Sequence, residues 1–146
     1  MKYIFSDLLK LSFVLFWTIS HSAQASDIKI FNVTDYKNII GQQNNEFIML
    51  FWSVECSPCI NEMRSISTLS KKQRNKFIFI STDGDEFMHE VSNTLNSLDL
   101  EKEKNWVFSS AATEEIINTI DSSWYGETPR SYYFDREKNR TRMINR

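Results

Sequence analysis

Apolar residues fall into short unbroken runs, each followed by a series at helical spacing. The runs 47–52 (FIMLFW) and 77–82 (FIFIST) are typical of strands buried on both faces of a sheet. The helix-spaced residues are Ile60, Met63, Ile66 and Leu69 after the first run, and Phe87, Val91, Leu95 and Leu98 after the second. Strands that alternate with amphipathic helices predict a sheet with parallel pairs.

The remaining segments complete an α/β pattern. We expect a first strand over 28–33 (IKIFNV), a short strand over 106–108 and a helix over 113–120, which has acidic residues in its first turn. Two closing strands, 131–135 (SYYFD) and 141–144 (TRMI), are joined by a charged turn. The predicted fold is therefore a central mixed sheet flanked by helices, with an antiparallel hairpin at the C-terminus.

The N-terminus has the pattern of a secretory signal. Lys2 precedes an apolar stretch, 11–19, and the sequence AQA at 23–25 has small residues two apart. The stretch is shorter than the roughly 20 residues that span a membrane. We predict a cleaved signal peptide over 1–25 and one domain over 26–146 that is periplasmic or otherwise exported. The alternative is an uncleaved anchor that holds the same domain at the outer face of the inner membrane.

Composition is that of a globular domain and argues against one class of partner. Apolar residues make up 41% and aromatic residues 14% of the 146 residues, enough for a real core. Without 1–25, which contain Lys2, Lys10 and Asp7, the chain has 15 basic and 18 acidic residues, a net charge of −3. This balance excludes a general nucleic-acid binder. Basic residues of 136–146 are interleaved with acidic ones, as in a solvated hairpin.

Cys56 and Cys59 are the chain's only two cysteines and lie directly after a predicted strand. As a structural staple they would close a loop of four residues, which restricts the unfolded chain by about 2 kcal/mol, against about 3 for fifteen. As a metal half-site they lack partners, because a structural zinc needs four ligands and only His89 remains beyond the signal. We therefore predict no metal.

The third interpretation, a redox pair, fits the local chemistry. A strand that leads into a helix N-terminus places Cys56 where unpaired N–H groups and the helix dipole stabilise a thiolate. Pro58, in the first turn, loses no helical hydrogen bond there. Cys59, one turn further along, can attack a mixed disulfide on Cys56 and release the partner. No bound cofactor is implied, because the two sulfur atoms carry the electrons.

The segments FWSVECSPCINEM (51–63) and WYGETPRSYYFD (124–135) resemble the thioredoxin superfamily, and within it the exported TlpA/ResA-type thiol–disulfide oxidoreductases. The resemblance covers roughly residues 30–144. The residues that match the family pattern are Phe51, Trp52, Cys56, Cys59, Glu62, Gly126 and Pro129. A lone Cys-x-x-Cys is a weak signal, but together with its strand, its helix and the distant Thr-Pro it is specific.

The resemblance implies a role for each of these positions. Pro129 would follow a cis peptide bond and pack against the cysteine pair, and Thr128 would contact the backbone of a bound substrate. Trp52 would pack beside the site. Glu62 would handle protons for the pair, since Cys59 lies three residues before it on the helix and must become a thiolate. An ordinary solvated glutamate is the alternative for this position.

Three features depart from the family. Leu50 stands where thioredoxin has a buried aspartate. Glu55 places a negative charge beside Cys56, which disfavours its thiolate. Because the chain stops two residues after the predicted final strand, we expect it to lack the last helix of the superfamily. One sheet face is then less covered, which favours a partner surface or self-association unless the segment 28–40 folds over it.

The resemblance implies an exported oxidoreductase that acts on protein thiols and disulfides. It favours a reductant that is fed by a membrane electron donor and serves a maturation pathway such as cytochrome c assembly. A disulfide oxidase or isomerase is the alternative within the same chemistry. A thioredoxin-fold module that binds extended peptides as a chaperone is the alternative from another class.

Overall fold

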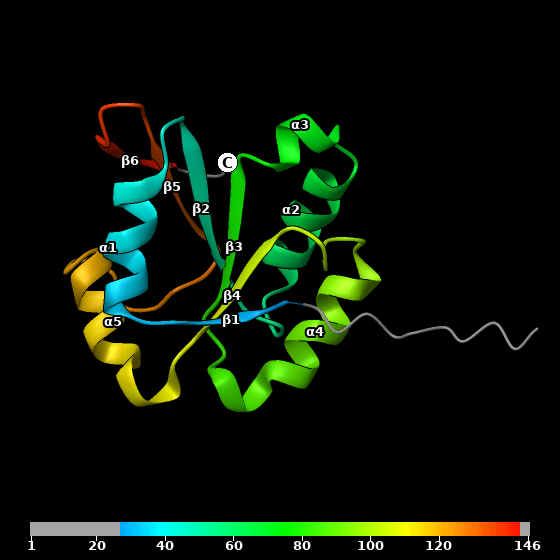
Figure 1. Ribbon diagram of the computed structural model, residues 1–146. Coiled ribbons are helices and arrows are strands. Elements are labelled where there is room, and N and C mark those ends of the chain that lie inside the picture. The colour runs from blue at the N-terminus through cyan, green and yellow to red at the C-terminus, as the bar shows by residue number, and fades with distance from the viewer. Residues whose placement is uncertain (1–26, 144–146) are drawn as a thin grey trace, which may run out of the picture.

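A six-stranded sheet with helices on both faces forms the core of the molecule, and the computed structural model describes residues 27–143 of it (Figure 1). The strand order is β1-β4-β3-β2-β5-β6. The strands are β1 (Lys29–Phe31), β2 (Phe47–Trp52), β3 (Phe77–Ser81), β4 (Lys104–Phe108), β5 (Arg130–Phe134) and β6 (Arg140–Met143). The pairs among β1, β4, β3 and β2 are parallel, β5 is antiparallel to β2, and β6 is antiparallel to β5, so the predicted mixed sheet and closing hairpin are confirmed.

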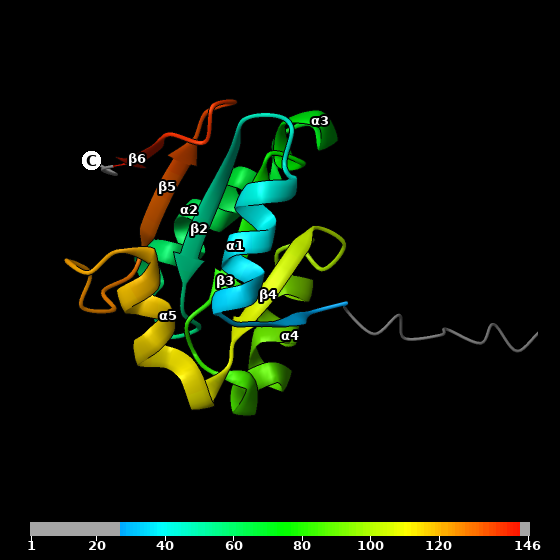
Figure 2. The same ribbon diagram turned by 60° about the vertical axis from the view of Figure 1, so that its left-hand side comes forward.

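The helices form two layers, one on each face of the sheet. They are α1 (Val33–Gln42), α2 (Ser57–Ser67), α3 (Lys71–Arg74), α4 (Met88–Ser97) and α5 (Thr113–Ile120), with the short 3₁₀ helices η1 (Asp85–Phe87) and η2 (Ser110–Ala112). Figures 1 and 2 show α1 and α5 on one face and α2 and α4 on the other. In the described part of the chain, no helix has the length and apolar character to cross a membrane. The predicted signal, 1–25, lies outside the described residues.

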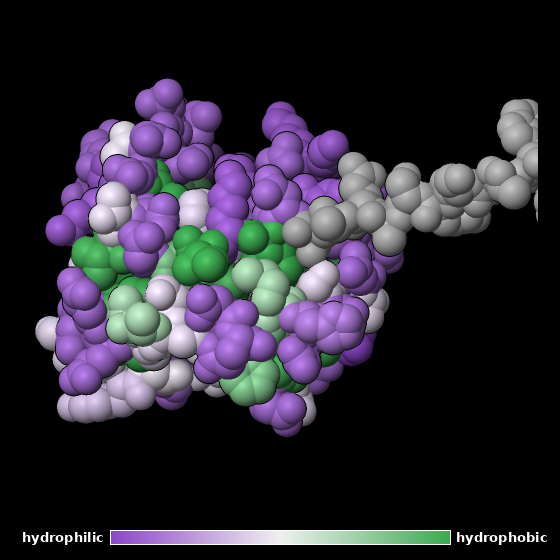
Figure 3. Space-filling view, turned by 60° about the horizontal axis from the view of Figure 1, so that its bottom comes forward, coloured by the Kyte–Doolittle hydropathy of each residue, from purple (hydrophilic) through white to green (hydrophobic). Residues whose placement is uncertain are grey.

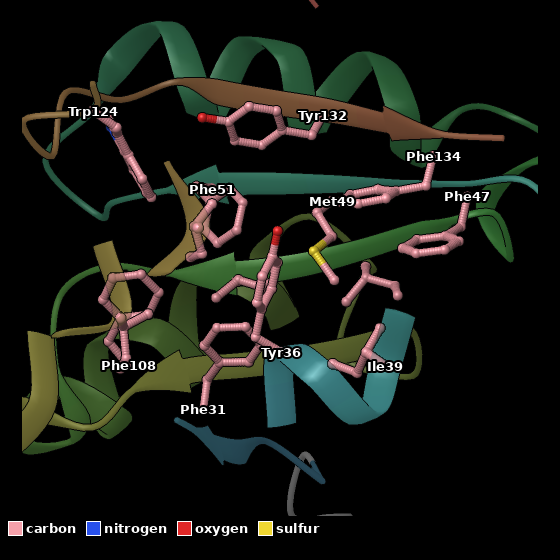
Figure 4. Packing of buried hydrophobic residues seen from close by; sticks show 14 residues of the cluster. Phe31, Tyr36, Ile39, Phe47, Met49, Phe51, Phe108, Trp124, Tyr132 and Phe134 are labelled. Atoms are coloured by element: carbon pink, nitrogen blue, oxygen red, sulfur yellow. The ribbon is translucent and has the colours of Figure 1, made fainter. Parts of the chain in front are cut away.

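Alternation along the strands divides the core into two clusters. Successive side chains of a strand point to opposite faces, so Phe47, Met49 and Phe51 of β2 face α1 and α5. This first cluster is largely aromatic, and Figure 4 shows its rings packed along the sheet. The second cluster lies under α2 and α4 and contains Leu50 and Trp52 of β2. Cys59 belongs to this second cluster, so the site is built on a packed layer.

The first strand is shorter than predicted, because a helix that the pattern did not reveal begins there. Asn32 caps α1: its side chain accepts hydrogen bonds from the backbone N–H groups of Thr34 (2.8 Å) and Asp35 (3.1 Å). Asp35 in turn accepts the N–H of Asn32 (3.1 Å), which completes a capping box. This polar cap overrides the strand-like alternation that precedes it, and β1 ends at Phe31.

One edge of the sheet is thinly covered on the α2 side. β6 ends at Met143, and residues 144–146 lie outside the described part of the chain. On this side Tyr133 is 37% and Met143 39% exposed. Segment 28–40 does not cover them, because α1 packs on the opposite face against the first cluster.

Candidate active site

The two cysteines lie where β2 passes into α2. β2 ends at Trp52, whose carbonyl accepts the backbone N–H of Thr82 from the end of β3 (2.8 Å). The N–H of Cys56 then donates to the carbonyl of Ser53 (3.1 Å), which turns the chain toward the helix. Cys56 is the N-cap of α2, and Pro58 lies in its first turn. The predicted placement of Cys56 at a helix N-terminus is therefore what the structure has.

Cys56 and Cys59 form a disulfide, with their Cα atoms 5.2 Å apart. Cys59 is completely buried in the second core cluster, whereas Cys56 is half-buried at the rim of that cluster. The backbone N–H of Cys59 points at Cys56 Sγ (3.2 Å). After reduction, this N–H and the helix N-terminus would stabilise a thiolate on Cys56. The more accessible sulfur is thus also the one at the helix N-terminus.

Asp83 fixes the loop between β2 and the disulfide, a role that the sequence did not reveal. Its carboxylate accepts hydrogen bonds from the hydroxyl of Ser53 (2.6 Å) and the backbone N–H of Val54 (3.0 Å). It also accepts the hydroxyl of Ser81 at the end of β3 (2.6 Å). The available signal was that β2 and β3 are parallel, so their carboxyl ends meet at one edge.

The second side of the site is the loop before β5. The peptide bond between Thr128 and Pro129 is cis, as the family resemblance implies, and both residues are half-buried. Arg130, the next residue, pairs with Phe51 near the end of β2. The Thr128–Pro129 loop therefore adjoins the strand that leads to the cysteines. We call residues 121–129 the platform loop.

A buried arginine braces the platform loop. Arg130 is 2% exposed, and β5 begins with it rather than at the predicted Ser131. Its guanidinium donates to Asp121 Oδ2 (2.8 Å), to Glu127 Oε1 (2.5 Å) and to the hydroxyl of Tyr132 (2.8 Å). It also lies over the ring of Trp124, 5.7 Å from the centroid. One side chain thus connects the end of α5, the platform loop and β5.

The charges of this network stabilise one another. Hydrogen bonds from Ser123, Tyr132 and Arg130 hold the pKa of Asp121 far below its usual range. Burial alone would lower the pKa of Arg130, but its hydrogen bonds with Tyr132 and Asp121 raise it. Burial and the hydrogen bond to Asp121 raise the pKa of Tyr132 to about 12. Figure 4 shows the Tyr132 hydroxyl directed along β5 toward Trp124. Arginine and aspartate therefore stay ionised at neutral pH.

The other predicted site residues lie near the pair. Trp52 is buried in the same cluster as Cys59, and its indole N–H has no hydrogen-bond partner among the described residues. Leu50 is buried there too, so an apolar side chain fills the position of the aspartate in thioredoxin. Glu62 is half-buried on α2, one turn after Cys59. Glu55 is exposed just before Cys56.

Within residues 27–143, no group of three or more histidine, cysteine or acidic side chains is placed to hold a metal ion. The structure brings together the disulfide, the buried ring of Trp52 and the platform loop.

Comparison with known proteins connects this arrangement to solved structures. The sequence matches no protein-family model and no curated protein. The fold is similar to that of a secreted Mycobacterium tuberculosis disulfide oxidoreductase described as homologous to E. coli DsbE, with a TM-score of 0.54, 17% identity and 73% of each chain covered.

Two further structures match in the same way. The thioredoxin domain of a Bacteroides vulgatus thiol–disulfide oxidoreductase has a TM-score of 0.54 and 14% identity, over 73% of this chain and 74% of that one. A thioredoxin-family thiol:disulfide interchange protein from Chlorobium tepidum has a TM-score of 0.55 and 15% identity, over 70% of each chain. The chain therefore has the thioredoxin fold, with a Cys-x-x-Cys disulfide at the start of α2.

Proposed function

We propose that this protein is an exported thiol–disulfide oxidoreductase that acts on the cysteines of other proteins. The observation that carries the proposal is the unequal pair: a disulfide with one accessible sulfur, Cys56, at a helix N-terminus and one buried sulfur, Cys59, behind it. This is the arrangement that two-step thiol–disulfide exchange requires. The solved structures with the same fold include oxidoreductases of this class, one of them secreted.

As a reductant, the reduced protein would act in two balanced steps. The Cys56 thiolate attacks one sulfur of a client disulfide, which forms a mixed disulfide and expels the other client sulfur as a thiolate. Cys59 loses its proton, with Glu62 as the proposed acceptor, and its thiolate attacks Cys56 Sγ. The Cys56–Cys59 disulfide forms and the second client sulfur leaves. Two electrons have then passed to the client, and a donor dithiol restores the reduced pair.

Binding of the client would use the platform loop. The backbone of Thr128, which precedes the cis-Pro129, would contact an extended client segment. Trp52 would pack beside the cysteine pair in the buried cluster that contains Cys59. Arg130 and Asp83 are positioning residues in this proposal, since each holds a loop on one side of the disulfide. A membrane electron donor and a maturation pathway such as cytochrome c assembly are the physiological setting that we propose from the family resemblance.

The reduction potential of the Cys56–Cys59 couple tests the proposed direction. Equilibration with glutathione or dithiothreitol buffers, followed by thiol alkylation, would measure it. A value near that of thioredoxin, about −270 mV, is expected for a reductant. A value near −120 mV would contradict that direction and indicate an oxidant.

A Cys56→Ser variant tests whether the protein is an enzyme at all. We expect it to keep its fold and lose all thiol–disulfide exchange, because the accessible sulfur is gone. A chaperone or peptide-binding module would instead keep its affinity and its effect on clients in this variant.

A further inference from the structure

Tyr125 lies on the platform loop and is 93% exposed, whereas no other large hydrophobic residue in the described part of the chain exceeds 48%. It precedes Thr128 by three residues, next to the proposed client-binding position. Within the fold nothing requires an aromatic ring at this point. A tyrosine presented to solvent beside a binding site is a common anchor residue, because its ring is large, amphipathic and loses little freedom on binding.

The backbone that carries Tyr125 is held on both sides. The N–H of Tyr125 donates to Glu127 Oε2 (3.1 Å), and the indole N–H of Trp124 donates to the carbonyl of Glu127 (2.8 Å). The other carboxylate oxygen of Glu127 is bound by the buried Arg130 (2.5 Å). The ring is therefore presented by a preorganised loop, which lowers the cost of ordering on binding.

The end of the molecule that carries the disulfide is rich in acidic residues, and this charge would determine which clients it attracts. The segments that follow β2, β3 and β4 and the one that precedes β5, namely 53–63, 82–90, 109–115 and 121–129, contain no lysine or arginine apart from Arg64, which lies just beyond the first of them. Their acidic residues are Glu55, Glu62, Asp83, Asp85, Glu86, Glu90, Glu114, Glu115, Asp121 and Glu127. Asp121 and Glu127 are neutralised in part, because both bind the buried Arg130 and the exposed Arg142 of β6 lies 3.9 Å from Glu127. The other eight acidic residues keep the balance of these segments negative.

Many of the basic residues lie at the opposite end. α3 and the turn between β5 and β6 lie at the top of Figures 1 and 2, away from the end of β2, whereas Arg142 of β6 reaches Glu127 (3.9 Å). Figure 3 views the other end, where hydrophobic residues form a broken band across the middle and hydrophilic residues surround them. The molecule thus presents its disulfide at an end with an acidic rim, which would attract cationic segments.

We propose that Tyr125 is a client-docking residue that selects extended segments with a lysine or arginine close to the reacting cysteine. The apolar stem of such a side chain would pack on the ring, and its cation would face the ring and the acidic rim. This inference rests on the proposed oxidoreductase function and names the class of client.

The test uses disulfide-bonded peptides that differ only in whether the residues beside the cysteine are lysine, leucine or glutamate. Their kcat/KM values for reduction are measured at low and high salt with wild-type protein, Tyr125→Ala, Tyr125→Phe and the control Tyr133→Ala. Tyr133 is also exposed but pairs with Ile48 at the start of β2, away from the cysteines that follow the end of this strand. A small uncharged disulfide reports the basal reaction.

We expect the lysine peptide to react fastest and the glutamate peptide slowest, with the difference shrinking at high salt because the attraction is screened. Tyr125→Ala should lower kcat/KM for the lysine peptide about fivefold through KM, the size of one exposed cation–π contact. Tyr125→Phe should restore it, and Tyr133→Ala should change nothing. Reaction with the small disulfide should stay the same in all variants.

Equal rates for the three peptides, a faster leucine peptide, or an unaltered Tyr125→Ala would overturn the inference. The small disulfide keeps this failure separate from that of the proposed function. If wild-type protein reduces it and Cys56→Ser does not, the oxidoreductase stands whatever the peptides show. If wild-type protein reduces no disulfide at all, the proposed function itself is wrong.

Discussion

Cys56 and Cys59 are three residues apart, yet one is at the surface and the other has no exposed area. The difference follows from helix geometry, because Cys56 caps α2 while Cys59 begins the face that packs with Met63 on the sheet. A buried thiol is harder to ionise than an exposed one, since burial disfavours charge. At the residue scale, the chemistry therefore needs an acceptor for the proton of Cys59.

Glu62 is the proposed acceptor, and its replacement gives the first prediction. Glu62→Gln should slow reduction of a peptide disulfide by about 100-fold, the lower end of a general acid–base contribution. It should also shift the titration of thiolate absorbance in the ultraviolet, because a nearby carboxylate repels a thiolate. Glu90→Gln, an exposed glutamate on α4, is the control. If Glu62→Gln matches that control in both measurements, Glu62 is an ordinary helix glutamate.

Loops rather than regular elements set the geometry of the site, and each is tied down by one charged side chain. Asp83 binds the loop before α2, and Arg130 binds the platform loop. Asp83 follows the end of β3 and Arg130 begins β5, so neither side chain belongs to the loop that it binds. Substitution of Asp83 should therefore loosen the loop before α2 and leave the platform loop in place, and substitution of Arg130 should do the reverse.

Removing the Asp83 carboxylate should lower both the free energy of unfolding and the rate of thiol–disulfide exchange. Asp83→Ala leaves the buried Ser81 hydroxyl and the Val54 N–H without their carboxylate, so we expect a loss of about 2 kcal/mol in the free energy of unfolding. Urea denaturation would measure it, and exchange with a small disulfide should slow because the cysteine loop loosens. Asp85→Ala, which breaks only the contact with Ser110, should leave the exchange rate unchanged. Equal exchange rates in the two variants would refute the positioning role of Asp83.

Removing the partner of the buried arginine should change the pH dependence of stability. The folded-state pKa of Asp121 lies below its unfolded value, so its stabilising contribution is present above about pH 4 and is lost as the pH falls. Asp121→Asn should cost about 3 kcal/mol at pH 7, because Arg130 stays buried with one partner fewer. The cost should shrink at pH 3. Denaturant midpoints at both pH values, with Asp27→Asn as control, would show it, and a pH-independent cost would contradict it.

At the scale of the whole molecule, periodicity and motif predicted the layers and the disulfide. The runs 47–52 and 77–82 form buried strands because their apolar side chains point to both faces of the sheet and must be covered on both. The helix α1 was missed because its signal is a polar cap at Asn32, inside a strand-like alternation. The roles of Asp83 and Arg130 could not be predicted, because they depend on contacts between segments that only the folded sheet brings together.

Trapping of mixed disulfides tests the central claim most directly. Reduced Cys59→Ser protein, incubated with a disulfide-bonded client, should accumulate a covalent complex on non-reducing gels, because the step that releases the client is lost. Mass spectrometry should place the client on Cys56. Cys56→Ser should form no such complex, since its remaining thiol is buried. A stronger complex with Cys56→Ser, or equal trapping by both variants, would contradict the assignment of Cys56 as the nucleophile of a two-step exchange.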